Sequence, residues 1–201
     1  MPVPYHPKHA WARAMVYFIA CILISHMSGA LGWVLHGPLA TAEQLRDPQW
    51  VALLIVSCVV IFIGYFVVWP RGTLTHGRRR NLAVVATFGV LWGVSEGLLF
   101  LSVFLLTQRF IASAVGATTA TFFILAAFLS SWHSLYWDIH VAPEHNIPEW
   151  NFRKVLFAHI PNLLVTLSFL SLYGNAAIFL LLQATALIAS TYFMRFPAFW
   201  E

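Results

Sequence analysis

The chain has 201 residues, of which 60% are hydrophobic and only 9% are charged, and its mean hydropathy is +0.78. Soluble domains carry about 25% charged residues, so this composition excludes an ordinary soluble domain and predicts an integral membrane protein. The net charge of +4 does not indicate a nucleic-acid partner, because the Lys and Arg residues lie at the ends of apolar runs. Cys21 and Cys58 both lie inside apolar runs, which excludes a disulfide framework and predicts two small buried side chains.

Taken in chain order, the sequence contains six apolar segments. A helix needs about 20 apolar residues to cross the hydrocarbon of a bilayer, and each segment reaches or nearly reaches that length. Gly37 and Pro38 follow the first segment, Pro70 ends the second, and Gly174 separates the last two. We therefore predict a single all-α domain over 1–201, a polytopic membrane protein built as a bundle of six transmembrane helices at about 12–35, 50–69, 81–107, 113–137, 154–173 and 175–195.

Positive charge is distributed unevenly between the two ends of these spans. With a cytoplasmic N-terminus, only Arg46 and Arg109 fall on the outer side. The inner side then holds nine basic residues: Lys8, Arg13, Arg71, Arg78, Arg79, Arg80, Arg153, Lys154 and Arg195. Because cytoplasmic loops are enriched in Lys and Arg, we predict that both termini and the loop 138–153 are cytoplasmic. If the chain is bacterial, the membrane is the plasma (inner) membrane.

The most polar part of the sequence joins the fourth and fifth spans. Its imidazoles and carboxylates are His133, Asp138, His140, Glu144, His145, Glu149 and His159. A helix rises about 1.5 Å per residue, which places His133 and His159 at the same depth on two neighbouring antiparallel helices. Imidazole and carboxylate groups together suit iron or zinc. The sequence therefore predicts a divalent metal site with the ligands His133, His140, His145 and His159. The alternative is a hydrogen-bond network of the same residues that holds the fourth and fifth spans together.

The positions of other residues near these predicted ligands suggest catalytic and substrate-binding roles for them. Asp138 or Glu144, whichever does not bind the metal, can serve as a general base. Tyr136 lies in the same polar run, and Asn162 shares a face of the fifth span with His159, because residues i and i+3 of a helix lie on one side. We expect Tyr136 and Asn162 to contact the substrate.

A second polar layer is predicted deeper in the membrane. His26 and Glu96 each lie about 21–23 Å from the cytoplasmic ends of their spans, so they can touch if the first and third spans are neighbours. Gln183 of the sixth span lies near the same level. Ionisable residues inside a membrane are costly and usually functional, so Glu96 is a catalytic or substrate-binding candidate and His26 a substrate-binding one. Small residues beside Glu96 form a ridge that allows close helix packing: Gly89, Gly93 and Gly97.

Two classes of function fit this pattern. The first is a small metal-dependent membrane enzyme, an oxidoreductase or a hydrolase, that acts on a membrane lipid or isoprenoid-like apolar molecule at the cytoplasmic leaflet. Haem bound by His133 and His159 is the less favoured cofactor. The second is a non-catalytic transporter, cofactor-holding subunit or scaffold that uses the layer of His26 and Glu96. The sequence sets neither the substrate nor the oligomeric state.

Overall fold

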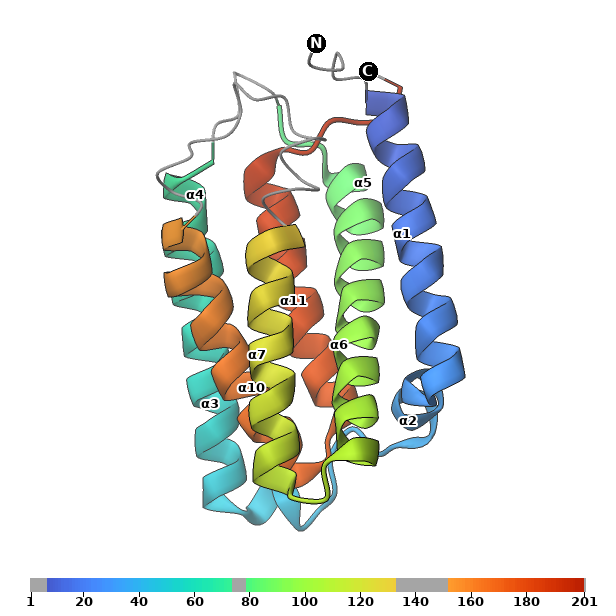
Figure 1. The fold of residues 1–201 in the computed structure, drawn as a ribbon. Helices are drawn as coiled ribbons and strands as arrows, with labels where there is room; N and C mark the ends of the chain where they lie inside the picture. The colour runs from blue at the N-terminus through green and yellow to red at the C-terminus, as the bar shows by residue number, and fades with distance from the viewer. Residues whose placement is uncertain (1–6, 74–78, 133–151, 201) are drawn as a thin grey trace.

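The computed structural model describes residues 7–73, 79–132 and 152–200. Six helical spans lie side by side and form one elongated bundle (Figure 1). The beginning of the first span at Pro7 and the residues that follow the last span lie at the same end of the bundle, as an even number of spans requires. The described chain is therefore all-helical, as the sequence predicts.

Three of the six candidate spans, the second, third and fifth, consist of more than one helical segment. The first comprises α1 (Pro7–Ser28), which is followed by α2 (Ala30–His36) and a 3₁₀ turn, η1 (Gln44–Arg46). The second span is α3 (Pro48–Phe62), the π-helix η2 (Ile63–Val68) and α4 (Trp69–Arg71). The third is α5 (Leu82–Val84), the π-helix η3 (Val85–Gly89) and α6 (Val90–Phe110). The fourth is α7 (Ala114–Trp132), the fifth is the π-helix η6 (Val155–His159) with α10 (Ile160–Tyr173), and the sixth is α11 (Ala176–Met194).

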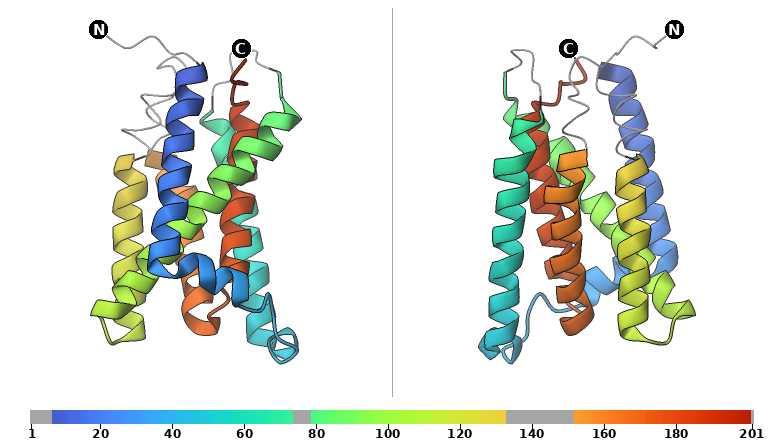
Figure 2. Two further views of the ribbon diagram at one scale, coloured as in Figure 1. Left: turned by 90° about the vertical axis from the view of Figure 1, so that its right-hand side faces the viewer. Right: turned by 60° about the vertical axis from the view of Figure 1, so that its left-hand side comes forward.

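The first span differs from the prediction of 12–35. It covers Pro7–Ser28, because Gly29 adopts a left-handed conformation with φ of 89° and ends α1. Arg109 of α6 donates to the carbonyl oxygen of Ser28 at 2.9 Å and so satisfies the end of this helix. After Gly29 the chain turns into α2, which leaves the axis of α1 (Figure 2).

The outside of the bundle is strongly apolar. The most apolar of the six candidate spans, Pro48–Arg71, is only 22% buried, whereas Leu82–Phe110 is 61% buried and carries the acidic residue Glu96. Met27 and Phe110 are among the large apolar side chains that are exposed. Soluble proteins rarely expose such extensive apolar surface, and by length and composition all six helices can cross a membrane. Cys58 lies on this outer surface, so the prediction that it is buried is wrong.

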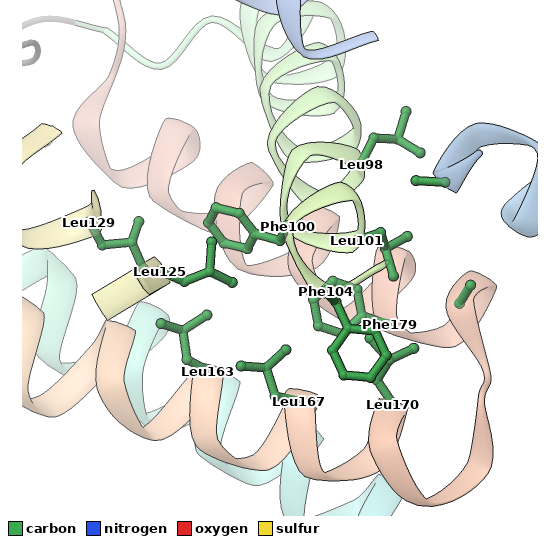
Figure 3. Close-up of a cluster of buried hydrophobic side chains, with 12 residues drawn as sticks. Leu98, Phe100, Leu101, Phe104, Leu125, Leu129, Leu163, Leu167, Leu170 and Phe179 are labelled. Atoms are coloured by element: carbon green, nitrogen blue, oxygen red, sulfur yellow. The ribbon is translucent and has the colours of Figure 1, made fainter. Parts of the chain in front are cut away.

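Helix α6 forms the centre of the bundle and crosses it obliquely (Figure 2). It contacts α1, α7 and α11. The predicted glycine ridge is the surface that packs on α11, since a Cβ added at Gly93 would lie 2.6 Å from the Ala184 Cα. Figure 3 shows a cluster of buried apolar side chains in which Phe100 of α6 lies near Leu125 of α7 and Leu163 of α10.

Two of the π-helices precede a proline. Pro70 and Pro161 have no backbone N–H, so neither can continue the hydrogen-bond ladder of an α-helix. In each case the residue before the proline bonds to a carbonyl five positions back, Trp69 to Gly64 and Ile160 to Val155. These wide turns lie in neighbouring spans, and η2 contacts η6.

Candidate functional site

The candidate site is built around His159, the last residue of η6. Its side chain is only 3% exposed. The two π-helices approach closely here, because a Cβ added at Gly64 of η2 would lie 3.0 Å from the Ala158 Cα. The absence of a side chain at Gly64 therefore lets Tyr65, the next residue, reach His159.

Aromatic rings surround the imidazole. The Tyr65 hydroxyl lies 2.9 Å from His159 Nδ1, and the indole of Trp69 meets the imidazole edge-on with ring centroids 5.3 Å apart. Tyr65 and Trp69 also stack on one another, and the Lys154 ammonium lies 4.6 Å from the centre of the Trp69 ring. These contacts fix both the position and the rotation of the His159 ring.

A hydrogen-bonded network extends from this pair into the bundle. The Asn162 amide nitrogen lies 3.4 Å from the Tyr65 hydroxyl and donates to Gln183 Oε1 at 2.9 Å. The Gln183 amide nitrogen donates to the Thr166 hydroxyl at 2.9 Å. All of these side chains are buried, and they connect η2, α10 and α11.

Two polar atoms beside His159 remain unsatisfied. Among the residues that the structure describes, Asn162 Oδ1 and Trp69 Nε1 are buried without a hydrogen-bond partner. Leaving such a group unpaired costs about 1–3 kcal/mol, and orphaned groups in native proteins call for an explanation such as a bound ligand. The cluster around His159 therefore keeps one acceptor and one donor without a partner.

Glu96 lies deeper, on α6, and is 1% exposed. Its Oε2 accepts a hydrogen bond from the indole of Trp92, one turn earlier. The carboxylate is close enough to Cys21 and Tyr65 to act on both electrostatically. Gln183 borders the same region, because a Cβ at Gly97 would lie 3.3 Å from its Cβ. Of the predicted deep layer, Glu96 and Gln183 therefore border one region of the bundle, which lies next to the network of His159.

His26 does not belong to that layer. The prediction pairs it with Glu96 because the two have similar depths, but His26 is exposed. The buried face of α1 includes Phe18, Cys21 and Ser25, and one further residue rotates a helix by about 100°. The first span also begins and ends at other residues than predicted. Equal depth, counted in residues from the span ends, therefore did not mean that His26 lies beside Glu96.

The remaining predicted site residues cannot be placed. They lie outside the described part of the chain: His133, Tyr136, Asp138, His140, Glu144 and His145. Within 7–73, 79–132 and 152–200, no group of three His, Cys, Asp or Glu side chains could hold a metal ion. The structure does show that α7, which ends one residue before His133, contacts η6, which ends at His159.

Tyr65 and Trp69 are the site residues that the sequence reasoning missed. Both lie in a segment that the sequence marks only as apolar. A signal was present, because a tyrosine hydroxyl or a tryptophan N–H inside a span needs a hydrogen-bond partner. Polar residues at 159, 162 and 183 in other spans were the available partners.

No family model, no curated protein and no solved structure matches this chain. Similarity therefore assigns neither a family nor an activity. The contacts around His159 and Glu96 are the basis on which a function can be proposed.

Proposed function

We propose that this chain is a multi-pass membrane enzyme, a hydrolase or an oxidoreductase, that acts on a lipid-like apolar substrate. The observation that carries the proposal is the buried His159, fixed by the Tyr65 hydroxyl and flanked by unpaired polar atoms of Trp69 and Asn162. Polar groups inside a bilayer are costly. A packing device would satisfy all of its polar atoms, whereas this cluster keeps an acceptor and a donor unused.

The substrate class follows from the surroundings of the imidazole. His159 lies within the span Phe152–Tyr173, among buried apolar and aromatic side chains. A molecule that reaches it must tolerate an apolar environment and must present a polar group to Trp69 or Asn162. A lipid or isoprenoid-like molecule with a polar end meets both conditions.

The proposal also includes a divalent metal, iron or zinc. The four predicted ligands are His133, His140, His145 and His159. The first three alone can complete a catalytic zinc site, which typically has three protein ligands and one position for water. Asp138 or Glu144 is then available as a general base. A bound metal of this kind would supply an activated water or a redox centre.

Elemental analysis tests the metal. The protein would be purified without a His-tag or a chelator in a mild detergent, and its iron and zinc content and visible spectrum would be measured. We expect close to one metal per chain, which is lost in His140→Ala. His36→Ala is the matched control, since His36 is an exposed histidine at the end of α2, and it should keep the metal. Absence of metal in the wild type would remove the metal from the proposal, and a Soret band would replace it with haem.

A second candidate function, proton-coupled transport, is favoured by one observation. Glu96 is a buried carboxyl group in the middle of the span Leu82–Phe110, and membrane-embedded carboxyls are typical proton carriers. Vesicles that contain the protein would be tested for proton uptake driven by candidate solutes. Uptake that Glu96→Gln abolishes and Glu43→Gln preserves would support this function, because Glu43 is an exposed carboxylate outside the spans.

A further inference from the structure

The hydrogen positions in the network of His159 can be deduced from one unambiguous group. The Thr166 hydroxyl lies 2.6 Å from the backbone carbonyl oxygen of Asn162. A carbonyl oxygen only accepts hydrogen bonds, so the single hydroxyl hydrogen of Thr166 must point at it. The Thr166 oxygen is therefore an acceptor towards every other neighbour.

This anchor orients the two amides. The Gln183 group that faces the Thr166 oxygen at 2.9 Å must be its NH₂, because two oxygens without a hydrogen between them repel. The Gln183 carbonyl oxygen consequently faces Asn162, also at 2.9 Å, and the group that Asn162 presents to it must be NH₂. Amide orientations are often ambiguous, but here a backbone carbonyl determines both.

The same reasoning reaches the imidazole. The Asn162 NH₂ lies 3.4 Å from the Tyr65 oxygen and can only donate. The Tyr65 hydroxyl hydrogen is therefore directed to its other neighbour, His159 Nδ1, at 2.9 Å. Since Nδ1 accepts this bond, the hydrogen of the neutral imidazole is on Nε2.

We infer that the network of Thr166, Gln183, Asn162 and Tyr65 holds His159 as the Nε2–H tautomer, so that His159 meets its ligand as a hydrogen-bond donor and does not bind a metal through Nε2. The tautomer follows from the network alone. Its use is a step further and rests on the proposed function: Nε2–H donates to the oxygen of a lipid-like substrate on which negative charge develops. Tyr65, Asn162 and Gln183 are then positioning residues that act through His159.

A network with the His159 hydrogen on Nδ1 agrees less well with the observed distances. If His159 carried its hydrogen on Nδ1, that hydrogen would face the Tyr65 oxygen, and the buried Tyr65 hydroxyl hydrogen would either lack an acceptor or point at Asn162. In the second case both amides would be reversed, and the Thr166 oxygen would contact two acceptor oxygens, at 2.6 and 2.9 Å, with a single hydrogen. One of these two contacts would then have no hydrogen between its oxygens, and in the first case a buried hydroxyl hydrogen would stay unpaired, so both arrangements are less favourable.

Nitrogen NMR of the histidine rings tests the tautomer directly. The full-length protein would be labelled with ¹⁵N-histidine, and the His159 signals would be identified by their loss in His159→Gln. Long-range ¹H–¹⁵N spectra distinguish a protonated ring nitrogen from an unprotonated one. We expect an unprotonated Nδ1 and a protonated Nε2 in the wild type, and the reverse assignment would overturn the inference.

The variant Tyr65→Phe tests whether the Tyr65 hydroxyl sets the tautomer of His159. This variant removes the donor to Nδ1, so the His159 signals should shift towards the other tautomer, while Tyr17→Phe, in another span, should leave them unchanged. An unaltered tautomer in folded Tyr65→Phe would show that Tyr65 does not set it. If Tyr65→Phe does not fold, Thr166→Val removes the anchoring hydroxyl instead. The wild-type spectrum, assigned with His159→Gln, still decides the tautomer.

Metal content separates this inference from the proposed function. If the wild type contains metal, His159→Gln should retain it, and loss of the metal in that variant would refute the donor role. If the wild type contains no metal, the metal part of the proposed function fails, while the NMR result still decides the tautomer.

Discussion

Replacement of Gly93 by alanine should separate the two most closely packed helices of the bundle. The added Cβ would lie 2.6 Å from the Ala184 Cα and 3.0 Å from the Ala184 carbonyl oxygen. Two carbon atoms are in favourable contact at about 3.5–4.0 Å, so α6 and α11 must move apart by about 1 Å at this crossing. The obstacle is backbone, which cannot rotate away as a side chain can.

The expected loss of stability follows from two opposing effects. Overpacking a core by one methyl group costs about 1–3 kcal/mol, and alanine gains about 1 kcal/mol over glycine inside a helix. Because the backbone of α11 cannot yield locally, we expect Gly93→Ala to lower the free energy of unfolding by about 1–2 kcal/mol. Gln183, which precedes Ala184, should shift with its helix, so the network of His159 is disturbed as well.

Unfolding in mixed micelles of a mild detergent and SDS, followed by circular dichroism, measures this change. Two glycine variants serve as controls. Gly32→Ala has nothing within 4 Å of its added Cβ, and Gly97→Ala meets the flexible end of Leu180 at 2.7 Å. We expect Gly32→Ala to match or exceed the wild type and Gly97→Ala to fall between the two others. Equal stability of Gly93→Ala and Gly32→Ala would refute the close contact of α6 with α11.

Three further predictions concern buried hydrogen bonds and the exposure of the two cysteines. Glu96→Leu leaves the Trp92 indole N–H without its acceptor, so it should unfold more easily than Glu96→Gln, by about 1–3 kcal/mol; equal stabilities of the two variants would contradict the contact. Trp50→Phe removes a buried indole hydrogen bond of 2.9 Å and should cost a similar amount, about 1–3 kcal/mol, in the same unfolding assay. In micelles, a small thiol reagent should modify the exposed Cys58 and spare the buried Cys21 until the protein unfolds, as mass spectrometry of the intact chain would show.

The positions of the spans could be predicted from the sequence because apolar length alone identifies them. Five of the six candidate spans agree with the prediction to within a few residues, except that the prediction for the fourth, 113–137, continues past Trp132, beyond the residues that the structure describes there. The predicted end of the first span was wrong because α1 ends at Gly29. A glycine inside an apolar run gives no indication of whether it adopts a positive φ. The glycine ridge was predictable, since small residues four apart on a helix form a continuous groove.

The contacts of the site were harder to predict than its position. The spans are apolar on nearly every side, so no polar stripe distinguishes the inner face from the outer one. His26 and Glu96 illustrate the consequence, because similar depth suggested a contact while helix rotation placed one outside and the other inside. Tyr65 was missed because it lies 94 residues from His159 in sequence, and only the packing of η2 on η6 connects them.

The strongly apolar exterior of the bundle reverses the usual pattern of tolerance to substitution. On the outer surface of Pro48–Arg71, leucine, valine, isoleucine and phenylalanine should exchange freely, since lipid accommodates any of these shapes. Inside, the identities of small residues such as Gly93 and of hydrogen-bonded ones such as Thr166 are each set by one neighbour. A saturation mutagenesis map of this chain should therefore show that the most hydrophobic segments tolerate the most substitutions. The least tolerant positions should be buried glycine, serine, threonine, asparagine and glutamine residues.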